Sequence, residues 1–194
     1  MSKRIALLSA AAFGALALTA AVIAPVSAQD KMMKSEMSGE KTVMVGGAAM
    51  FPSKNIVQNA VNSKDHTTLV AAVKAAGLVD TLEGKGPFTV FAPTNAAFGK
   101  LPTGTVDTLV KPENKPALTK ILTYHVVPGK LEASSLTDGK KLKTVEGEEL
   151  TVKKSGDKVM IVDAKGGSAT VTIPNVNQSN GVIHVVDTVL MPAS

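Results

Sequence analysis

The chain has 194 residues, no cysteine and a formal net charge of +5. The absence of cysteine excludes disulfides, thiol catalysis and cysteine-based metal sites. One Tyr, five Phe and no Trp leave little surface on which bases could stack, and a mildly basic balance does not by itself indicate a nucleic-acid-binding protein.

The first 28 residues have the three-part layout of a secretory signal peptide. A Lys-Arg pair at residues 3–4 precedes a nearly uninterrupted apolar run over residues 5–23, and Val-Ser-Ala at 26–28 predicts cleavage after Ala28. An uncleaved membrane anchor is the alternative, because the apolar run approaches the length that spans a bilayer. Cleavage would leave 194 − 28 = 166 residues, enough for one domain, in the periplasm or outside the cell.

Residues 29–49 combine Lys, Glu, Ser and Gly with several methionines and show no helical or strand periodicity. We interpret them as a flexible leader that precedes a domain over residues 50–194. Thioethers bind soft ions such as Cu(I), so an exported methionine-rich segment could hold copper; a composition-biased tail is the alternative interpretation. The methionines concerned are Met32, Met33, Met37, Met44 and Met50.

Helical patterns dominate the first part of the predicted domain. Residues 55–62 and 65–76 carry apolar side chains at helical spacing, and Gly77 ends the second of these helices. A later helix is predicted to open around Pro116 and to end at residues 128–129, a Pro-Gly pair. Its apolar stripe consists of Leu118, Ile121, Leu122 and Val126.

Strand patterns follow. Residues 88–92, between two prolines, are typical of a short buried strand, and Thr94 is a good N-cap for the helical turn after it. Anions can bind where Thr94 and Asn95 stand, between a strand and a helix, but capping explains these residues more simply. Helices followed by strands indicate an α+β fold. The later strands are predicted at residues 141–144, 149–153, 158–162, 169–173 and 182–186.

Three segments together resemble the fasciclin-like domain family. Residues 86–98 (GPFTVFAPTNAAF) look like its first signature block, residues 122–127 (LTYHVV) contain its Tyr-His pair, and residues 180–192 (NGVIHVVDTVLMP) look like its second block. The resemblance covers residues 52–192 and is to the single-domain bacterial secreted type. It implies a wedge-shaped β-sandwich with several helices packed along one edge, in a secreted or surface protein associated with cell adhesion and matrix contacts.

Tyr124 and His125 form the pair that the resemblance implicates in interaction, because the corresponding pair of animal members is implicated in integrin-type adhesion. Helical spacing offers a structural role instead. His125 follows Leu122 and Ile121 by three and four residues, on the core side of the helix, where it would satisfy a backbone carbonyl. The spacing favours the structural role.

The last predicted strand contains two polar residues of interest. His184 alternates with Ile183 and Val185, so we expect it to face the opposite side of the strand and to be half exposed. Asp187 must be exposed or paired, because burying a lone carboxylate is costly. A structural hydrogen bond or a contact at the rim is therefore expected for Asp187.

Motifs that carry chemistry are missing from the sequence. No two of the three histidines, including His66, have metal-ligand spacing, and the chain has no nucleophile elbow and no phosphate-binding glycine loop. We therefore expect no catalytic residue, no metal and no cofactor. An enzyme would need facing carboxylates or histidines with perturbed pKa values in a pocket.

These patterns favour a secreted, non-catalytic module that mediates cell adhesion or contacts a cell-surface or matrix protein or polymer. A carrier of a small apolar ligand or a soft metal ion is the alternative, and an apolar cleft between the helices and the sandwich would favour it. No nucleic-acid partner is expected, and no membrane span after signal cleavage. The sequence is compatible with more than one oligomeric state.

Overall fold

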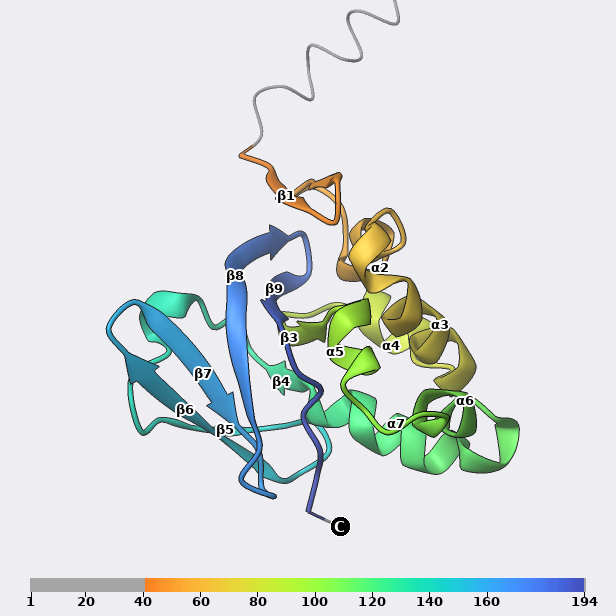
Figure 1. The fold of residues 1–194 in the computed structure, drawn as a ribbon. Helices are drawn as coiled ribbons and strands as arrows, with labels where there is room; N and C mark the ends of the chain where they lie inside the picture. The colour runs from red at the N-terminus through yellow and green to blue at the C-terminus, as the bar shows by residue number, and fades with distance from the viewer. Residues whose placement is uncertain (1–40, 194) are drawn as a thin grey trace, which may run out of the picture. The chain divides into compact units, whose positions relative to one another are not determined.

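The computed structural model describes residues 41–193; the predicted signal peptide and residues 29–40 of the predicted leader lie outside the described residues. Helices and strands are both present, so the α+β expectation is confirmed (Figure 1). The helices are α2 (Ile56–Ala60), η2 (Lys64–His66), α3 (Thr67–Ala76), α4 (Val79–Glu83), α5 (Asn95–Gly99), α6 (Thr105–Leu109), η3 (Pro112–Asn114), α7 (Lys115–Tyr124) and η4 (Ala133–Ser135).

The strands form a hairpin and one larger sheet. In the seven-stranded sheet the order is β4-β3-β9-β8-β7-β6-β5, in which β3 and β9 are parallel and the other neighbours antiparallel. The strands are β1 (Val43–Val45), β2 (Ala48–Met50), β3 (Phe88–Pro93), β4 (Val126–Pro128), β5 (Lys141–Lys143), β6 (Glu149–Ser155), β7 (Lys158–Val162), β8 (Ser168–Gln178) and β9 (Gly181–Val186).

The long strand β8 turns this sheet into a sandwich. Its pairing with β9 shifts register between Val171 and Val176, and Asn175 there has a positive φ of 56°. Such bulges bend a strand and increase its twist. The sheet curls far enough that the N–H of Val145, beyond β5, donates to the Val126 carbonyl on β4 at 2.8 Å. The two ends of the strand order are therefore joined.

Alternating side chains on the central strands divide the interior into two cores. On β3, Val90 and Ala92 belong to a core shared with the helices, whereas Phe91 between them belongs to a core shared with β5, β6 and β7. This is the two-residue period of a strand that is buried on both faces. Figure 1 shows the resulting order, with α2 to α7 on one side of β3 and β9, and β6 and β7 on the other.

The predicted helix signals agree with the structure at most positions. The helix predicted to end at residues 128–129 is the exception: α7 ends at Tyr124, and Val126 lies on β4 because residues 126–128 pair with β3. Gly77 ends α3 with a φ of 72°, the left-handed conformation that glycine adopts without steric cost. In α7 the predicted stripe is buried at Leu118, Ile121 and Leu122, and α3 packs against α7. Among residues 41–193, no helix is long and apolar enough to cross a membrane.

The folded domain begins earlier than the predicted boundary at residue 50. Residues 43–50 form the β1–β2 hairpin, whose Val45 and Met50 are buried in the helix-side core. Its turn is Gly46-Gly47, both with positive φ, a hairpin signal that the methionine-rich composition obscured. The Gly46 carbonyl accepts a hydrogen bond of 3.2 Å from the N–H of Lys64, which ties the hairpin to η2.

Candidate functional site

Tyr124, the last residue of α7, lies inside the sandwich core. Its side chain is fully buried, and its hydroxyl accepts a 2.9 Å hydrogen bond from the N–H of Ala164 and points at the Glu149 carbonyl 3.4 Å away. Burial raises the pKa of Tyr124, and the charge of Asp163 adds to this effect. The phenol is therefore held neutral, and its hydroxyl is hydrogen-bonded to backbone groups of its own domain.

His125 follows Tyr124 and is also buried, with 2% of its surface exposed. Its Nδ1 lies 2.8 Å from the Ile121 carbonyl, and its Nε2 lies 3.0 Å from the N–H of Leu190. The first nitrogen must donate and the second must accept, so these partners require the neutral Nδ1–H tautomer. Desolvation lowers the pKa of His125 to about 4. The geometry favours the structural role for the Tyr-His pair.

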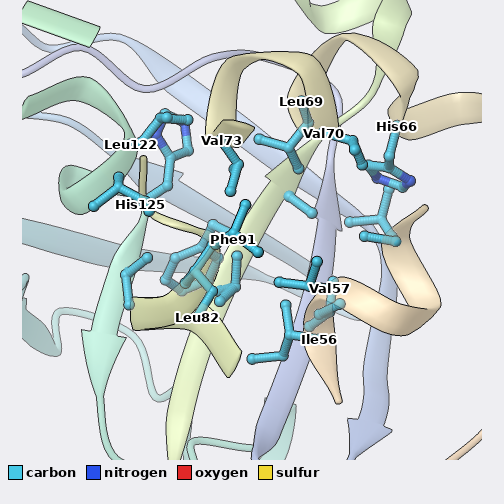
Figure 2. Close-up of a pocket in the computed structure, with 18 of the residues that line it drawn as sticks. Ile56, Val57, His66, Leu69, Val70, Val73, Leu82, Phe91, Leu122 and His125 are labelled. Carbon is cyan, nitrogen blue, oxygen red and sulfur yellow. The ribbon is translucent and has the colours of Figure 1, made fainter. Parts of the chain in front are cut away.

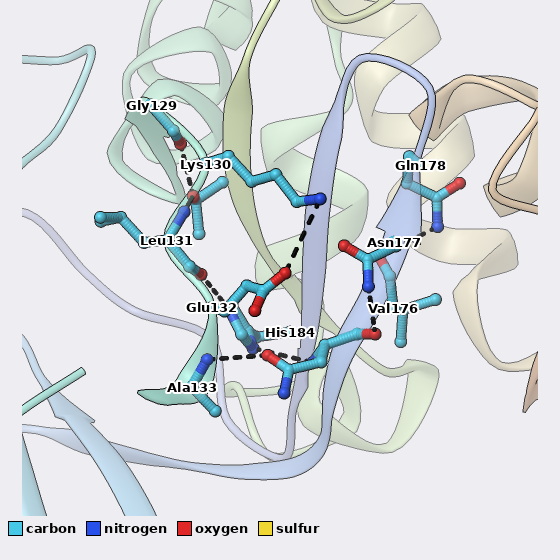
Figure 3. A network of polar contacts seen from close by, with 11 residues as sticks. Gly129, Lys130, Leu131, Glu132, Ala133, Val176, Asn177, Gln178 and His184 are labelled. Carbon is cyan, nitrogen blue, oxygen red and sulfur yellow. Dashed lines mark hydrogen bonds and ion pairs between the residues drawn. The ribbon is translucent and has the colours of Figure 1, made fainter. Parts of the chain in front are cut away.

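His184 on β9 is completely buried, contrary to the half-exposed position expected for it. Its Nε2 lies 2.7 Å from the Leu131 carbonyl (Figure 3). Its Nδ1 accepts from the N–H of Asn175, and its ring stacks on Phe91. Burial lowers the pKa of His184. The expectation failed because it considered β9 alone; β8 and residues 129–133 cover the face on which His184 lies.

Thr94 and Asn95 cap two different helices. The Thr94 hydroxyl accepts from the N–H of Ala97 at 3.2 Å, as predicted for the N-cap of α5. The Asn95 side chain instead reaches α3: its Oδ1 accepts from the N–H of Thr68 at 3.0 Å and its Nδ2 donates to the Lys64 carbonyl at 2.8 Å. Both side chains satisfy helix termini of their own domain.

Asp187 is half-buried and paired. Its Oδ1 accepts from the Thr170 N–H at 2.8 Å and from the Thr188 hydroxyl at 3.0 Å, and Lys100 Nζ lies 3.6 Å from Oδ2. Burial raises the pKa of Asp187, but these hydrogen bonds and the lysine charge outweigh it and hold the pKa below its usual value. The carboxylate joins β8 to the segment that follows β9.

His66 stands at an apolar cavity of about 50 Å³ between the helices and the β3–β9 face (Figure 2). Its Nδ1 bonds the Ser63 hydroxyl at 2.9 Å, whereas its buried Nε2 has no hydrogen-bond partner in the described part of the chain. Burial lowers the pKa of His66, partly opposed by the nearby Ala92 carbonyl. The cavity wall includes Val57, Leu69, Val73, Leu82, Phe91 and Ile183.

Within residues 41–193, no three side chains of the His, Asp and Glu types gather closely enough to hold a metal ion. Three of the five methionines considered for copper lie outside the described residues; of the other two, Met44 is exposed and Met50 is buried. The copper interpretation therefore stays a prediction.

The partly buried Asn180 and the buried Asn59 connect distant segments, a role that the sequence did not indicate. Asn180 accepts from the N–H of Ile56 through Oδ1 and donates to the carbonyls of Leu82 and Gly84 through Nδ2. Asn59 holds both backbone groups of Phe51 in the same way. The Asn-Gly pair at 180–181 indicated a turn, but nothing in the spacing reveals partners about a hundred residues away.

The polar side chains of the signature segments therefore act mainly on the backbone of their own domain. A model of the family described as Fasciclin domain matches residues 64–192. The chain belongs to the fasciclin domain family.

Among curated relatives, protein sll1483 of Synechocystis sp. is 50% identical over 153 residues, which cover 79% of this chain and 82% of that protein. Immunogenic protein MPB70 of Mycobacterium bovis is 36% identical over 199 residues, covering 99% and 98% of the two chains. Cell surface glycolipoprotein MPB83 of the same species is 40% identical over 153 residues, covering 76% of this chain and 64% of that protein.

A solved structure of a FAS1 domain pair from the insect cell adhesion molecule Fasciclin I aligns with a TM-score of 0.64 at 18% identity. The alignment covers 73% of this chain and 52% of that chain, so this protein spans about half of the pair. This likeness shows the fold, and it confirms the fold family that the signature segments indicated.

Proposed function

We propose that this protein is an exported, non-catalytic module that contacts a cell-surface or matrix polymer or protein and thereby supports adhesion. The observation that carries the proposal is the similarity over most of the chain to a protein named as a cell-surface glycolipoprotein, together with membership of the fasciclin domain family. The buried positions of Tyr124 and His125 direct the proposed contact to exposed strands and loops.

Deleting the gene in the native host tests this function. We expect lower adhesion of the cells to one another or to a surface, and restoration by a copy that carries a C-terminal tag. The tagged protein should be recovered from the surface or medium fraction. A matched control copy lacking residues 5–23 should stay inside the cell and fail to restore adhesion. Unchanged adhesion in the deletion strain, or a protein confined to the cytoplasm, would contradict the proposal.

The apolar cavity favours a second candidate function, carriage of a small apolar ligand. The cavity lies between the helices and the sandwich, where a carrier was expected to have an apolar cleft. His66 Nε2 supplies one polar group at the cavity wall. Its volume of about 50 Å³ is well below the roughly 300–1,000 Å³ of sites for drug-sized ligands. Such a carrier would therefore hold a ligand of a few atoms, or open by moving α3 or α4 side chains.

Organic extraction of the protein purified from its native host tests the carrier function. Mass spectrometry should find one apolar compound in an amount comparable to that of the protein. Extracts of a variant with Val73→Phe, which fills the cavity from α3, should lack this compound. Extracts of wild-type protein without any such compound would end this candidate.

A further inference from the structure

Strands β5, β6 and β7 bury one face in the sandwich core and expose the other. Leu142 pairs with Leu150 across β5 and β6, and Val152 pairs with Ile161 across β6 and β7; all four are buried. Because side chains alternate along a strand, the residues between them point away from the core. Four exposed lysines stand at these outward positions: Lys141, Lys143, Lys153 and Lys158.

The strand register arranges these lysines in a row. Lys141 and Lys143 are two residues apart on β5, about 7 Å along the strand. Lys153 on β6 is the diagonal neighbour of Lys141, and Lys158 on β7 is the diagonal neighbour of Lys153. Diagonal neighbours lie about 7–8 Å apart. Lys141, Lys153 and Lys158 therefore lie along one oblique line that crosses three strands, and Lys143 extends the row along β5.

Little negative charge opposes this row. Glu149 is the one acidic residue in these three strands, and its Oε2 lies 3.2 Å from Lys141 Nζ. Both side chains of that pair are more than half exposed, so the ion pair contributes little stability. Four lysines against one glutamate leave a positive face within the three strands. Of the acids that flank the strands, Asp138, Glu148 and Asp163 accept hydrogen bonds from the backbone N–H groups of Lys154, Ala193 and Met191, and Asp157 stands in the turn before Lys158.

The chemistry of this face selects among polyanions. Lysine presents a mobile point charge, unlike the planar guanidinium of arginine. Such charges suit a polymer that carries anionic groups at regular intervals. The three strands contain no aromatic residue on which the bases of a single strand could stack, and a broad sheet face does not enter a duplex groove. Met160 and Val162 are partly buried, so no large apolar side chain of the three strands projects for insertion into lipid.

We propose that this row of four lysines, Lys141, Lys143, Lys153 and Lys158, binds a linear polysaccharide that carries carboxylate or sulfate groups. The inference rests on the proposed surface function and names the chemistry of its partner. Glu149 moderates the affinity by competing with the polymer for Lys141.

Titration of the purified exported protein with polygalacturonate and with dextran sulfate tests the proposal and separates the two anions. Both complexes should weaken as salt rises, and neutral dextran should not bind. The combined change Lys143→Gln, Lys153→Gln and Lys158→Gln should weaken binding roughly tenfold, from the loss of three exposed charge contacts. Arginine at the same three positions should retain binding. Glu149→Gln should strengthen binding, a gain that misfolding cannot produce.

A variant of equal net charge is the matched control. Lys74, Lys85 and Lys111 are exposed lysines outside the three strands, and their combined replacement by Gln should leave binding unchanged. Equal weakening in both triple variants, no polyanion binding by wild-type protein, or tighter binding to duplex DNA or to phosphatidylserine vesicles would overturn the proposal. If polyanion binding is absent while the deletion strain loses adhesion, this inference fails and the proposed function stands; unchanged adhesion removes the proposed function itself.

Discussion

His125 Nε2 accepts a 3.0 Å hydrogen bond from the backbone N–H of Leu190, a residue 65 positions further along the chain. The other ring nitrogen donates to the Ile121 carbonyl within α7, so the imidazole joins the end of that helix to the segment after β9. Each ring nitrogen has one backbone partner, and the arrangement requires an uncharged ring. The residue that the family resemblance associated with adhesion therefore connects two parts of the core.

Replacing this imidazole should destabilise the domain strongly. We expect His125→Ala to lower the free energy of unfolding by about 3 kcal/mol, because it leaves a cavity and two buried backbone groups without partners. Urea denaturation at neutral pH measures the change. Lys111→Ala at an exposed position should change stability by less than about 0.5 kcal/mol. A loss below about 1 kcal/mol for His125→Ala would contradict the structural role.

The stability of the domain should fall on acidification between neutral pH and pH 4. His125 has a pKa of about 4 when folded and an ordinary value of 6.5, so the unfolded state binds more protons in this window and stability rises with pH across it. The full difference corresponds to about 3 kcal/mol for His125. Burial lowers the pKa values of His66 and His184 as well, which adds to the loss in the same direction.

Urea midpoints measured from pH 7.5 down to about pH 4.5 report this dependence before most carboxylates titrate. His125→Gln should flatten the profile, since it removes one of the groups that must stay neutral. The pKa of Asp187 is also lowered, but its contribution is lost only as pH falls below its ordinary value of 3.8, outside this window. A midpoint independent of pH above 4.5 would show that the histidines titrate normally in the folded state.

Tyr124→Phe should lower the stability of the domain without changing its binding to polysaccharide. Removing the hydroxyl leaves the Ala164 N–H without its 2.9 Å acceptor, and we expect a loss of about 1–2 kcal/mol in the free energy of unfolding. Binding to polygalacturonate should be unchanged, because Tyr124 is buried on the other side of the sheet from the lysine row. A folded variant that keeps its stability but loses surface binding would instead make Tyr124 a contact residue.

Asn180 should prove more sensitive to substitution than an ordinary turn residue. Asn180→Ala removes three hydrogen bonds to the backbone of residues in α2 and around the end of α4, and we expect a loss of about 2–3 kcal/mol. Asn180→Asp keeps the acceptor for Ile56 but places a carboxylate against the Leu82 and Gly84 carbonyls. In thermal denaturation the Asn180→Asp variant should therefore be no more stable than the Asn180→Ala variant. Wild-type stability in either variant would show that Asn180 does not hold these segments together.

Local signals in the sequence predicted much of the secondary structure. The Thr94 cap depends on the next three residues, and the buried stripe of α7 depends on a spacing of three and four. Both are properties of a short segment, so they can be inferred without knowledge of the rest of the chain. The succession of such segments was sufficient to indicate α+β, and three signature blocks were sufficient for the family.

Long-range pairing decided what the local signals could not. An Asn-Gly pair such as that at 180–181 is typical of a turn, yet a Cβ on Gly181 would collide with the Phe88 carbonyl, because β9 runs parallel to β3 at this point. The burial of His184 likewise depends on β8 and residues 129–133.

The lysine row shows the same division most clearly. Alternation within β5, β6 and β7 determines which face each lysine occupies, and this was readable from each segment alone. Whether Lys141, Lys153 and Lys158 are neighbours depends on the register between strands, and a shift of one residue would move a whole strand's side chains to the other face. The sequence by itself therefore determined most of the helices and strands after residue 50, the Thr94 cap and the family. The packing of distant strands decided which polar residues are buried and which charges meet at the surface.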